Sequence, residues 1–314
     1  MYVQEFIKRN TAIDVNANAP GVNIHITEHG SDWLFAAFSV FGLLMVVNAF
    51  MYIKTNGVKR ALFISPLITT IIMTGAYFIY ASNLGNAGVP VEFTHADAGV
   101  RQVFYSKIIA WFLAWPWVLA TCEVITHPDL TATGNRGILS RFVSFFSGLF
   151  IKIVAIEVYV LGVLVGSVVL STYKWGFFAI GVFGLLSLIF LVGADLFHSF
   201  KNSAKSKVGN FLIIFILVVW ILYPICWALS GGGNVIQPDS EAVFDGILDL
   251  INFGIVPTIL TWIAIGNVDE IFFKNFCHYC DASPLANEKE IDTTPTHSGD
   301  TSVAPAGVTA VDEV

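Results

Sequence analysis

Long hydrophobic runs alternate with short polar segments along most of this 314-residue chain. An apolar run of about 18 or more residues with few charges is typical of a helix that spans a membrane. Seven such runs are present, at approximately residues 33–53, 61–82, 102–124, 143–171, 176–197, 208–230 and 242–266. A soluble helical protein would carry polar stripes along runs of this length, and these runs mostly lack them. The pattern predicts an all-α membrane protein whose seven transmembrane helices form one domain.

The segments outside these runs are polar and predict the organisation of the chain. Residues 1–30 are expected to form an extracellular arm, and residues 31–274 the seven-helix domain. Residues 275–314 are rich in Thr, Ser, Pro, Ala and acidic residues, a composition that cannot bury enough apolar surface to fold alone. We expect a disordered cytoplasmic tail there. Charged residues make up only 12% of the chain, about half the fraction found in a typical soluble domain.

The distribution of basic residues predicts the orientation in the membrane. Alternate connections carry nine of them: Lys54, Lys59, Arg60, Arg136, Arg141, Lys201, Lys205, Lys207 and Lys274. The opposite connections hold Arg101 and Lys174, and the arm holds Lys8 and Arg9. Because short cytoplasmic loops carry the excess of Lys and Arg, the N-terminus is expected outside and the C-terminus in the cytoplasm.

Two cysteines, Cys277 and Cys280, follow the last hydrophobic run. Cysteines beside a membrane are candidate palmitoylation sites, and two unmodified thiols are an equally good interpretation. The pair is a weak indication of zinc because no second pair of ligands stands nearby, so no metal site is predicted. The chain has no phosphate-binding loop, no nucleophile motif and no basic patch suited to nucleic acid. We therefore expect no enzymatic activity and no nucleic-acid partner.

Three of the runs carry aromatic, proline and acidic residues at fixed spacings. The third contains W-x4-P at residues 111–116, the sixth contains W-x2-YP-x2-W at residues 220–227, and the seventh contains E-x7-D at residues 241–249. In these helices and at these spacings, the patterns resemble those of the microbial rhodopsins over about residues 31–274. The resemblance implies a seven-helix microbial rhodopsin-like bundle, with a β-hairpin between about residues 83 and 100.

The resemblance also implies where a retinal chromophore would lie. A vestigial pocket is expected from Trp111, Trp115, Pro116, Glu157, Trp220, Pro224 and Trp227. Phe253 stands at the position of the retinal-bearing lysine, one helical turn after Asp249. A Schiff base requires a primary amine, which phenylalanine lacks, so we expect no covalent retinal. The pocket is then either packed with aromatic rings, which we favour, or open to a non-covalent apolar ligand such as a sterol or an isoprenoid.

Other departures from the microbial rhodopsin pattern indicate one group within the family. Ala110 and Thr121 replace the two proton-relay carboxylates of the third helix, and Trp115 replaces a small hydroxyl residue. Together with Phe253, these residues resemble the fungal opsin-related proteins, which include the thirty-kilodalton heat-shock membrane protein of yeasts. That resemblance implies a plasma-membrane protein that is linked to stress and has no light-driven pumping.

Several charged residues fall inside the runs, where each costs about 2.5–3.5 kcal/mol to insert unless it finds a partner. By analogy with the rhodopsin arrangement, Asp249 would approach Tyr80, Tyr223 and Lys107, with the lysine as its countercharge. We interpret this polar cluster as structural, with a proton or ion path as the alternative.

Four more polar residues of the runs carry predictions about their surroundings. Glu157 is expected to face the pocket as a neutral group, whereas Lys152 is expected to reach the cytoplasmic interface with its long side chain. We expect Glu123 at the same interface and Asp195 at a hydrated helix end.

The function implied by the resemblance alone is a stress-associated accessory, regulatory or chaperone-like role, for example on the plasma-membrane proton ATPase. One alternative is a sensor that binds an apolar ligand in a cavity lined by Trp111, Trp220 and Phe253. Another is a proton or ion conductor that uses Lys107, Asp249 and Glu157, which would require a continuous polar path. The lipid bilayer is the expected surrounding partner. Bundles of this kind often form homo-oligomers, and no feature of the sequence selects a state.

Overall fold

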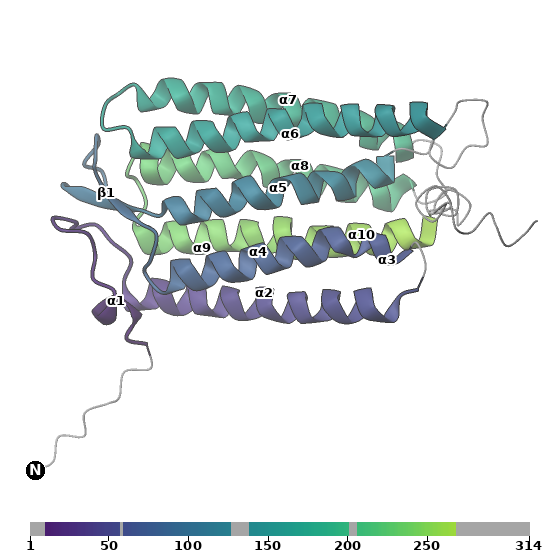
Figure 1. The fold of residues 1–314 in the computed structure, drawn as a ribbon. Coiled ribbons are helices and arrows are strands. Elements are labelled where there is room, and N and C mark those ends of the chain that lie inside the picture. Colours follow the sequence, from purple (N-terminus) through teal and green to yellow (C-terminus); the bar gives the residue numbers. More distant parts are fainter. Residues whose placement is uncertain (1–9, 57–58, 127–137, 201–205, 268–314) are drawn as a thin grey trace, which may run out of the picture. The chain divides into compact units, whose positions relative to one another are not determined.

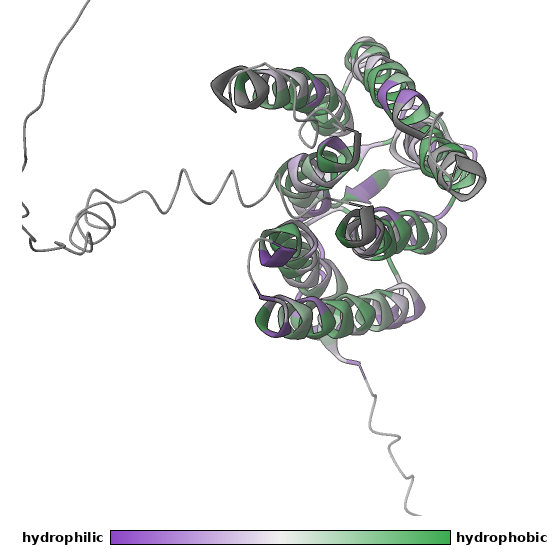
Figure 2. Ribbon diagram, turned by 90° about the vertical axis from the view of Figure 1, so that its right-hand side faces the viewer, coloured by the Kyte–Doolittle hydropathy of each residue, from purple (hydrophilic) through white to green (hydrophobic). Residues whose placement is uncertain are grey.

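The helices of the protein follow the seven hydrophobic runs. The computed structural model describes residues 10–56, 59–126, 138–200 and 206–267, which belong to one unit of the chain. Within these residues, seven helical segments are long and apolar enough to cross a membrane, as predicted. They pack side by side with their axes roughly along one direction (Figures 1 and 2). Candidate sites Cys277 and Cys280 lie outside the described residues.

The first five crossings are formed by regular helices, the second of them in two pieces. They are α2 (Glu28–Lys54), α3 with α4 (Lys59–Leu62 and Ile64–Ala81), α5 (Tyr105–Thr126), α6 (Ile138–Val168) and α7 (Lys174–Phe200). Of all the crossings, α5 is the most enclosed by its neighbours.

The last two crossings contain π-helical turns. The helix α8 (Ser206–Trp227) continues into the π-helix η2 (Ala228–Gly232), and α9 (Pro238–Asp249), η3 (Leu250–Ile255) and α10 (Val256–Asn267) form one span. Single π-helical turns inside α-helices are frequently found at functional sites. Because η3 begins directly after Asp249 and contains Phe253, the helix geometry changes at the residues that the sequence singled out.

A β-hairpin covers the end of the bundle at which α2 begins. The strands β1 (Ala87–Pro90) and β2 (Val100–Val103) are antiparallel, which confirms the hairpin expected between the second and third helices. We call this the hairpin end of the bundle; the short helix α1 (Ala12–Val15) lies there too (Figure 1).

The segment before α2 packs onto the hairpin end. Ile24 forms a parallel bridge with Arg101 of β2, and the side chains of Ile24 and Ile26 are buried. The polar arm predicted for residues 1–30 therefore differs from the structure between residues 10 and 30. Residues 10–27 are folded against the bundle, and α2 begins at Glu28.

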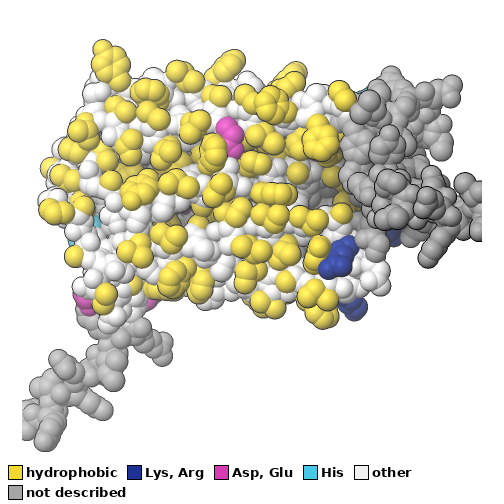
Figure 3. Space-filling model, in the orientation of Figure 1, with side chains coloured by type: hydrophobic (Ala, Val, Ile, Leu, Met, Phe, Trp, Pro, Cys, Tyr) yellow, Lys and Arg dark blue, Asp and Glu magenta, His cyan; other side chains and the backbone are white. Residues whose placement is uncertain are grey.

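The outer faces of the helices are hydrophobic (Figures 2 and 3). On α7, for example, Phe183 and Phe190 are 74% and 75% exposed, which suits contact with lipid rather than water. The helices α6 and α7 approach closely where glycines meet. A Cβ atom on Gly162 would lie 2.9 Å from the Cα of Gly181, so the close packing requires glycine at this position.

Candidate functional site

Asp249 lies at the centre of the bundle in a cage of neutral hydrogen-bond donors. Its side chain is fully buried and accepts hydrogen bonds from the hydroxyl groups of Tyr77 on α4 (2.7 Å) and Tyr223 on α8 (2.8 Å). The indole Nε1 of Trp111 on α5 donates to both carboxylate oxygens, at 3.0 and 3.1 Å. These contacts, which we call the carboxylate cage, join four helices through one side chain.

A group of paired charges lies between the cage and the hairpin end. Lys107 on α5 donates to Asp245 and, at 3.1 Å, to Glu241, and the guanidinium group of Arg101 binds Glu241 at 2.8 Å. Two cations therefore face two carboxylates, and the charges balance. We call these four residues, Arg101, Lys107, Glu241 and Asp245, the hairpin-side ion cluster.

Two details of the predicted polar cluster are wrong. Tyr77, not Tyr80, donates to Asp249, and the ring of Tyr80 instead lies beneath the ammonium group of Lys107, 5.6 Å from its nitrogen. Lys107 pairs with Asp245, one helical turn before Asp249. The physical reason is helix periodicity, because residues three or four apart share a face. The four-residue spacing puts Glu241, Asp245 and Asp249 on one face of the helix, so Asp245 could have been named as a candidate from the sequence. Packing between the helices selects which of the three pair with Lys107.

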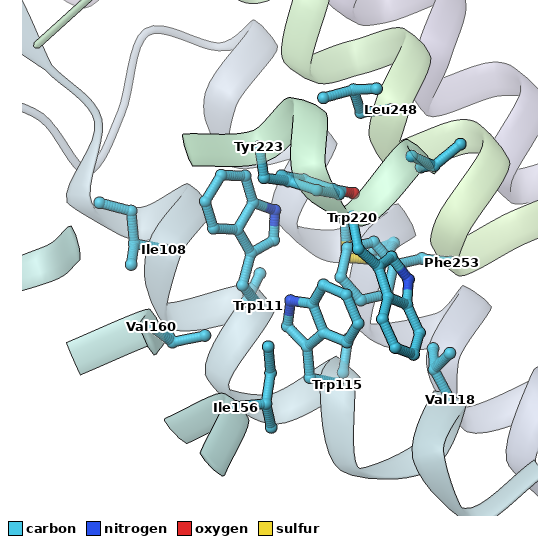
Figure 4. Packing of buried hydrophobic residues seen from close by; sticks show 14 of the residues in the cluster. Ile108, Trp111, Trp115, Val118, Ile156, Val160, Trp220, Tyr223, Leu248 and Phe253 are labelled. Atoms are coloured by element: carbon cyan, nitrogen blue, oxygen red, sulfur yellow. The ribbon is translucent and has the colours of Figure 1, made fainter. Parts of the chain in front are cut away.

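Next to the cage, three aromatic rings pack edge to face. The ring of Trp115 on α5 lies 5.2 Å from that of Trp220 on α8 and 5.4 Å from that of Phe253 in η3 (Figure 4). All three side chains are fully buried, and Trp220 donates from Nε1 to Asn252 at 2.8 Å. We call Trp115, Trp220 and Phe253 the aromatic layer. These rings fill the space between α5, α8 and η3. Of the two expected alternatives, this arrangement corresponds to a pocket packed with aromatic rings and not to one open to a ligand.

The remaining residues of the vestigial pocket do not join this layer. Trp227 donates to Ser167 at 2.7 Å and stacks on Phe178 at 4.5 Å. Pro116 lies inside α5, whereas Pro224 lies inside α8 and borders an apolar groove of about 280 Å³ between α7 and α8.

Glu157 on α6 is only partly buried as a residue. Its two carboxylate oxygens are enclosed and find no hydrogen-bond partner among the described residues. Within the described ranges, no hydrogen bond links Glu157 to the aromatic layer, and its assignment to the pocket stays a prediction.

A second charged group lies in the other half of the bundle. Lys152 on α6 pairs with Glu123 on α5 and, at 2.6 Å, with Asp195 on α7. The side chain of Lys152 does not extend out of the bundle as expected, because both it and Glu123 are buried. The reason is that the two groups neutralise each other, which makes burial of the pair less costly than burial of either charge alone. We call Glu123, Lys152 and Asp195 the Lys152 triad.

The interior between these two charged groups is mostly apolar. Along α5, Trp111 belongs to the cage, Trp115 to the aromatic layer, and Val118 and Leu119 are completely buried. Polar contacts resume at Thr121, whose hydroxyl lies 2.7 Å from that of Ser65. Ala110 is buried and supplies no carboxylate. In the part of the chain that the structure describes, no three His, Cys, Asp or Glu residues could hold a metal ion.

Comparison with known proteins decides the family. The family model described as bacteriorhodopsin-like protein matches residues 28–264. The chain belongs to the bacteriorhodopsin-like family. Among solved structures, that of the light-driven proton pump rhodopsin of Coccomyxa subellipsoidea superposes with a TM-score of 0.64 at 18% identity, covering 76% of this chain and 98% of that one. At this identity the likeness establishes the fold, a seven-helix microbial rhodopsin-like bundle.

Fungal relatives within the bacteriorhodopsin-like family are more similar in sequence. The 30 kDa heat shock protein of Saccharomyces cerevisiae is 35% identical, covering 96% of this chain and 94% of the yeast protein. The opsin-like protein carO of Fusarium fujikuroi is 36% identical, covering 82% of this chain and 81% of the relative. These matches confirm the resemblance to the fungal opsin-related proteins, and the protein is a multi-pass membrane protein of that group.

Proposed function

We propose that this protein is a non-photoactive opsin scaffold in the plasma membrane, with a stress-associated regulatory or chaperone-like role. The observation that carries the proposal is the position of Phe253. It is fully buried against Trp115, at the place where the family resemblance puts the retinal-bearing lysine. A phenylalanine side chain there can neither form a Schiff base nor leave the space that a polyene would need.

The lysines inside the bundle support the same conclusion. Each of them pairs with at least one carboxylate. Lys107 pairs with Asp245 and Lys152 with Glu123. Lys174 pairs with Glu92 at 3.0 Å. A protonated, ion-paired amine is a poor nucleophile. Among the described residues, none of these amines is available to replace the missing one without breaking a buried ion pair.

The stress-associated role rests on the relatives. One of them carries the name of a heat shock protein and matches nearly the whole of this chain. A scaffold without its own chemistry acts by contact with other membrane components, and the plasma-membrane proton ATPase is the partner we propose to examine first. Homo-oligomers are compatible with the same role.

Deletion of the gene tests this role in cells. Proton extrusion by the ATPase is followed as acidification of the medium, before and after heat or acid stress. We expect the deletion strain to differ from the parent only after stress, and re-expression of the wild-type chain to restore the parental rate. Equal acidification by the two strains under every stress would contradict the regulatory role.

The two alternative functions receive less support from the geometry. An internal ligand-binding cavity would need space among Trp111, Trp220 and Phe253, where the rings of the aromatic layer are in contact. A conductor would need a continuous polar path, and along α5 the apolar residues from Trp115 to Leu119 interrupt it. A direct check is ion flux through proteoliposomes, which we expect to match that of empty vesicles.

A further inference from the structure

Three cations gather where α2 ends and α3 begins, at the end of the bundle opposite the hairpin. They are Lys54, Lys59 and Arg60, and the side chains of Lys54 and Arg60 are exposed. Figure 3 shows Lys and Arg side chains at this corner, next to a hydrophobic side face. The positive-inside rule accounts for basic residues on this side of the membrane, but not for their arrangement.

Two of these cations are held over aromatic rings. The guanidinium carbon of Arg60 lies 4.2 Å from the ring centroid of Tyr52, and the ammonium nitrogen of Lys54 lies 5.8 Å from that of Phe50. A cation stacked on an aromatic face is restrained in position, so less conformational freedom is lost when it binds an anion. Stacking on a ring face uses none of the hydrogen-bond donors of either group.

The same two cations have no acidic partner in the described part of the chain. The buried cations Arg101, Lys107, Lys152 and Lys174 all form ion pairs. In the described ranges, Lys54 and Arg60 instead contact aromatic rings. The surrounding helices α3, α4 and α10 contain no acidic residue, and the acids of α2 lie at its other end. Among the described residues, the positive charges of Lys54 and Arg60 therefore have no carboxylate beside them at this corner of the bundle.

Apolar surface adjoins the cations along the helix. Phe50 and Ile53 on α2 are 60% and 71% exposed, and Trp262 on α10 is 53% exposed. The ring of Trp262 meets that of Phe63, beside α3, at 6.4 Å. Tryptophan with one face in lipid is characteristic of the headgroup level of a bilayer. The cations thus lie at the depth of phosphate groups, directly beyond a surface suited to acyl chains.

We propose that this corner binds the headgroup of an anionic membrane lipid, with the lipid's acyl chains along the exposed face of α2. Arg60 and Lys54 contact the phosphate, and Lys59 adds positive charge. A guanidinium group can donate two parallel hydrogen bonds to a phosphate, which an ammonium group cannot. The basic connections of the chain place this lipid in the cytoplasmic leaflet.

Native mass spectrometry of the full-length protein tests the proposal. The protein in detergent is titrated with phosphatidylserine or with phosphatidylcholine of the same acyl chains. We expect preferential retention of phosphatidylserine, and an apparent affinity roughly a hundredfold lower in the K54Q/K59Q/R60Q variant, from the usual contribution of each basic residue near a lipid surface. Phosphatidylcholine binding stays unchanged.

A matched control separates a defined site from general attraction. The K201Q/K205Q/K207Q variant loses the same number of cations from another connection on the same predicted side. We expect it to stay within about threefold of the wild type. Equal losses in the two variants, or equal retention of the two lipids by the wild type, would overturn the proposal.

Two milder substitutions keep the test decisive if the triple variant does not fold. R60K preserves the charge but removes the planar group, and Y52L removes the ring under it. We expect each to weaken phosphatidylserine retention several-fold, because both remove the restrained guanidinium geometry. Wild-type retention in both variants would contradict binding through the stacked arginine.

Discussion

The two charged groups of the bundle differ in their charge balance among the described residues and in how far they are exposed at its surface. The hairpin-side ion cluster pairs two cations with two carboxylates, and Arg101, Lys107 and Asp245 are almost completely buried. Among the described residues, the Lys152 triad sets one cation between two carboxylates, and Asp195 has 46% of its side chain exposed. The first group pairs its charges inside the bundle, whereas the second has one carboxylate exposed at the surface of the bundle. The aromatic layer keeps the two apart.

This comparison indicates how the bundle is held together on the two sides of the aromatic layer. In the half near the hairpin, the ion cluster and the carboxylate cage join α4, α5, α8 and α9. In the other half, the triad joins α5, α6 and α7. The helix α5 takes part in both groups, and Phe253 and Trp115 fill the space between them. Each half therefore has its own polar connections, and the interior has no continuous polar path along α5.

The largest expected effect is the loss of Lys107. In K107M, Asp245 is left buried without its cation and Glu241 keeps only Arg101, so we expect a destabilisation of about 3–5 kcal/mol. Unfolding of the purified protein in mixed micelles measures it. The double variant K107M/D245L should recover part of the loss, because it removes the orphaned carboxylate. If K107M were as stable as the wild type, the hairpin-side ion cluster would not be buried as described.

Truncation of Trp115 tests the aromatic layer. In W115A, a large cavity opens beside Trp220 and Phe253, and we expect a loss of about 3–4 kcal/mol. The control is F183A on α7, whose ring is 74% exposed and which should cost less than about 1 kcal/mol. Similar losses in the two variants would mean that Trp115 contributes no more to packing than a lipid-facing residue.

A pair of tyrosine variants tests the corrected carboxylate cage. Y77F removes one of the donors to fully buried Asp249, and we expect a cost of about 1–3 kcal/mol. Y80F leaves the ring beneath Lys107 in place and should cost less than about 0.5 kcal/mol. The same unfolding measurement distinguishes them. The opposite order would restore Tyr80 as the partner of Asp249.

The smallest expected effect is that of Asp195. Because this carboxylate is half exposed, D195N should cost about 0–1 kcal/mol. D245N makes the equivalent change in the hairpin-side cluster, where Lys107 is buried, and should cost about 3 kcal/mol. Equal costs for the two variants would remove the distinction between a fully buried charged group and a partly exposed one.

The sequence predicted the fold well because hydrophobic length and motif spacing are local properties. The spacings around Trp111, Trp220 and Asp249 identified the three helices that meet at the centre of the bundle. They did not determine which neighbour each charge selects. The choice of Tyr77 over Tyr80, and of Asp245 over Asp249 for Lys107, depends on helix rotation and on packing between spans.

The triad shows the same limit more clearly. Lys152 and Glu123 are 29 residues apart, on different helices, and each looks interfacial when considered alone. Only their proximity makes burial favourable, and nothing in the local sequence indicates it. The burial of Ile24 and Ile26 in an otherwise polar segment was missed for a similar reason, since β2 provides their partners.

Incubation of the purified protein with all-trans retinal tests the central claim most directly. The visible spectrum is recorded before and after hydroxylamine, and the intact mass is measured after borohydride reduction, which would fix any Schiff base. With Phe253 in the aromatic layer and the lysines of the bundle ion-paired, we expect only the spectrum of free retinal and no gain in mass. A red-shifted, hydroxylamine-sensitive band with a retinyl adduct on the protein would contradict the account.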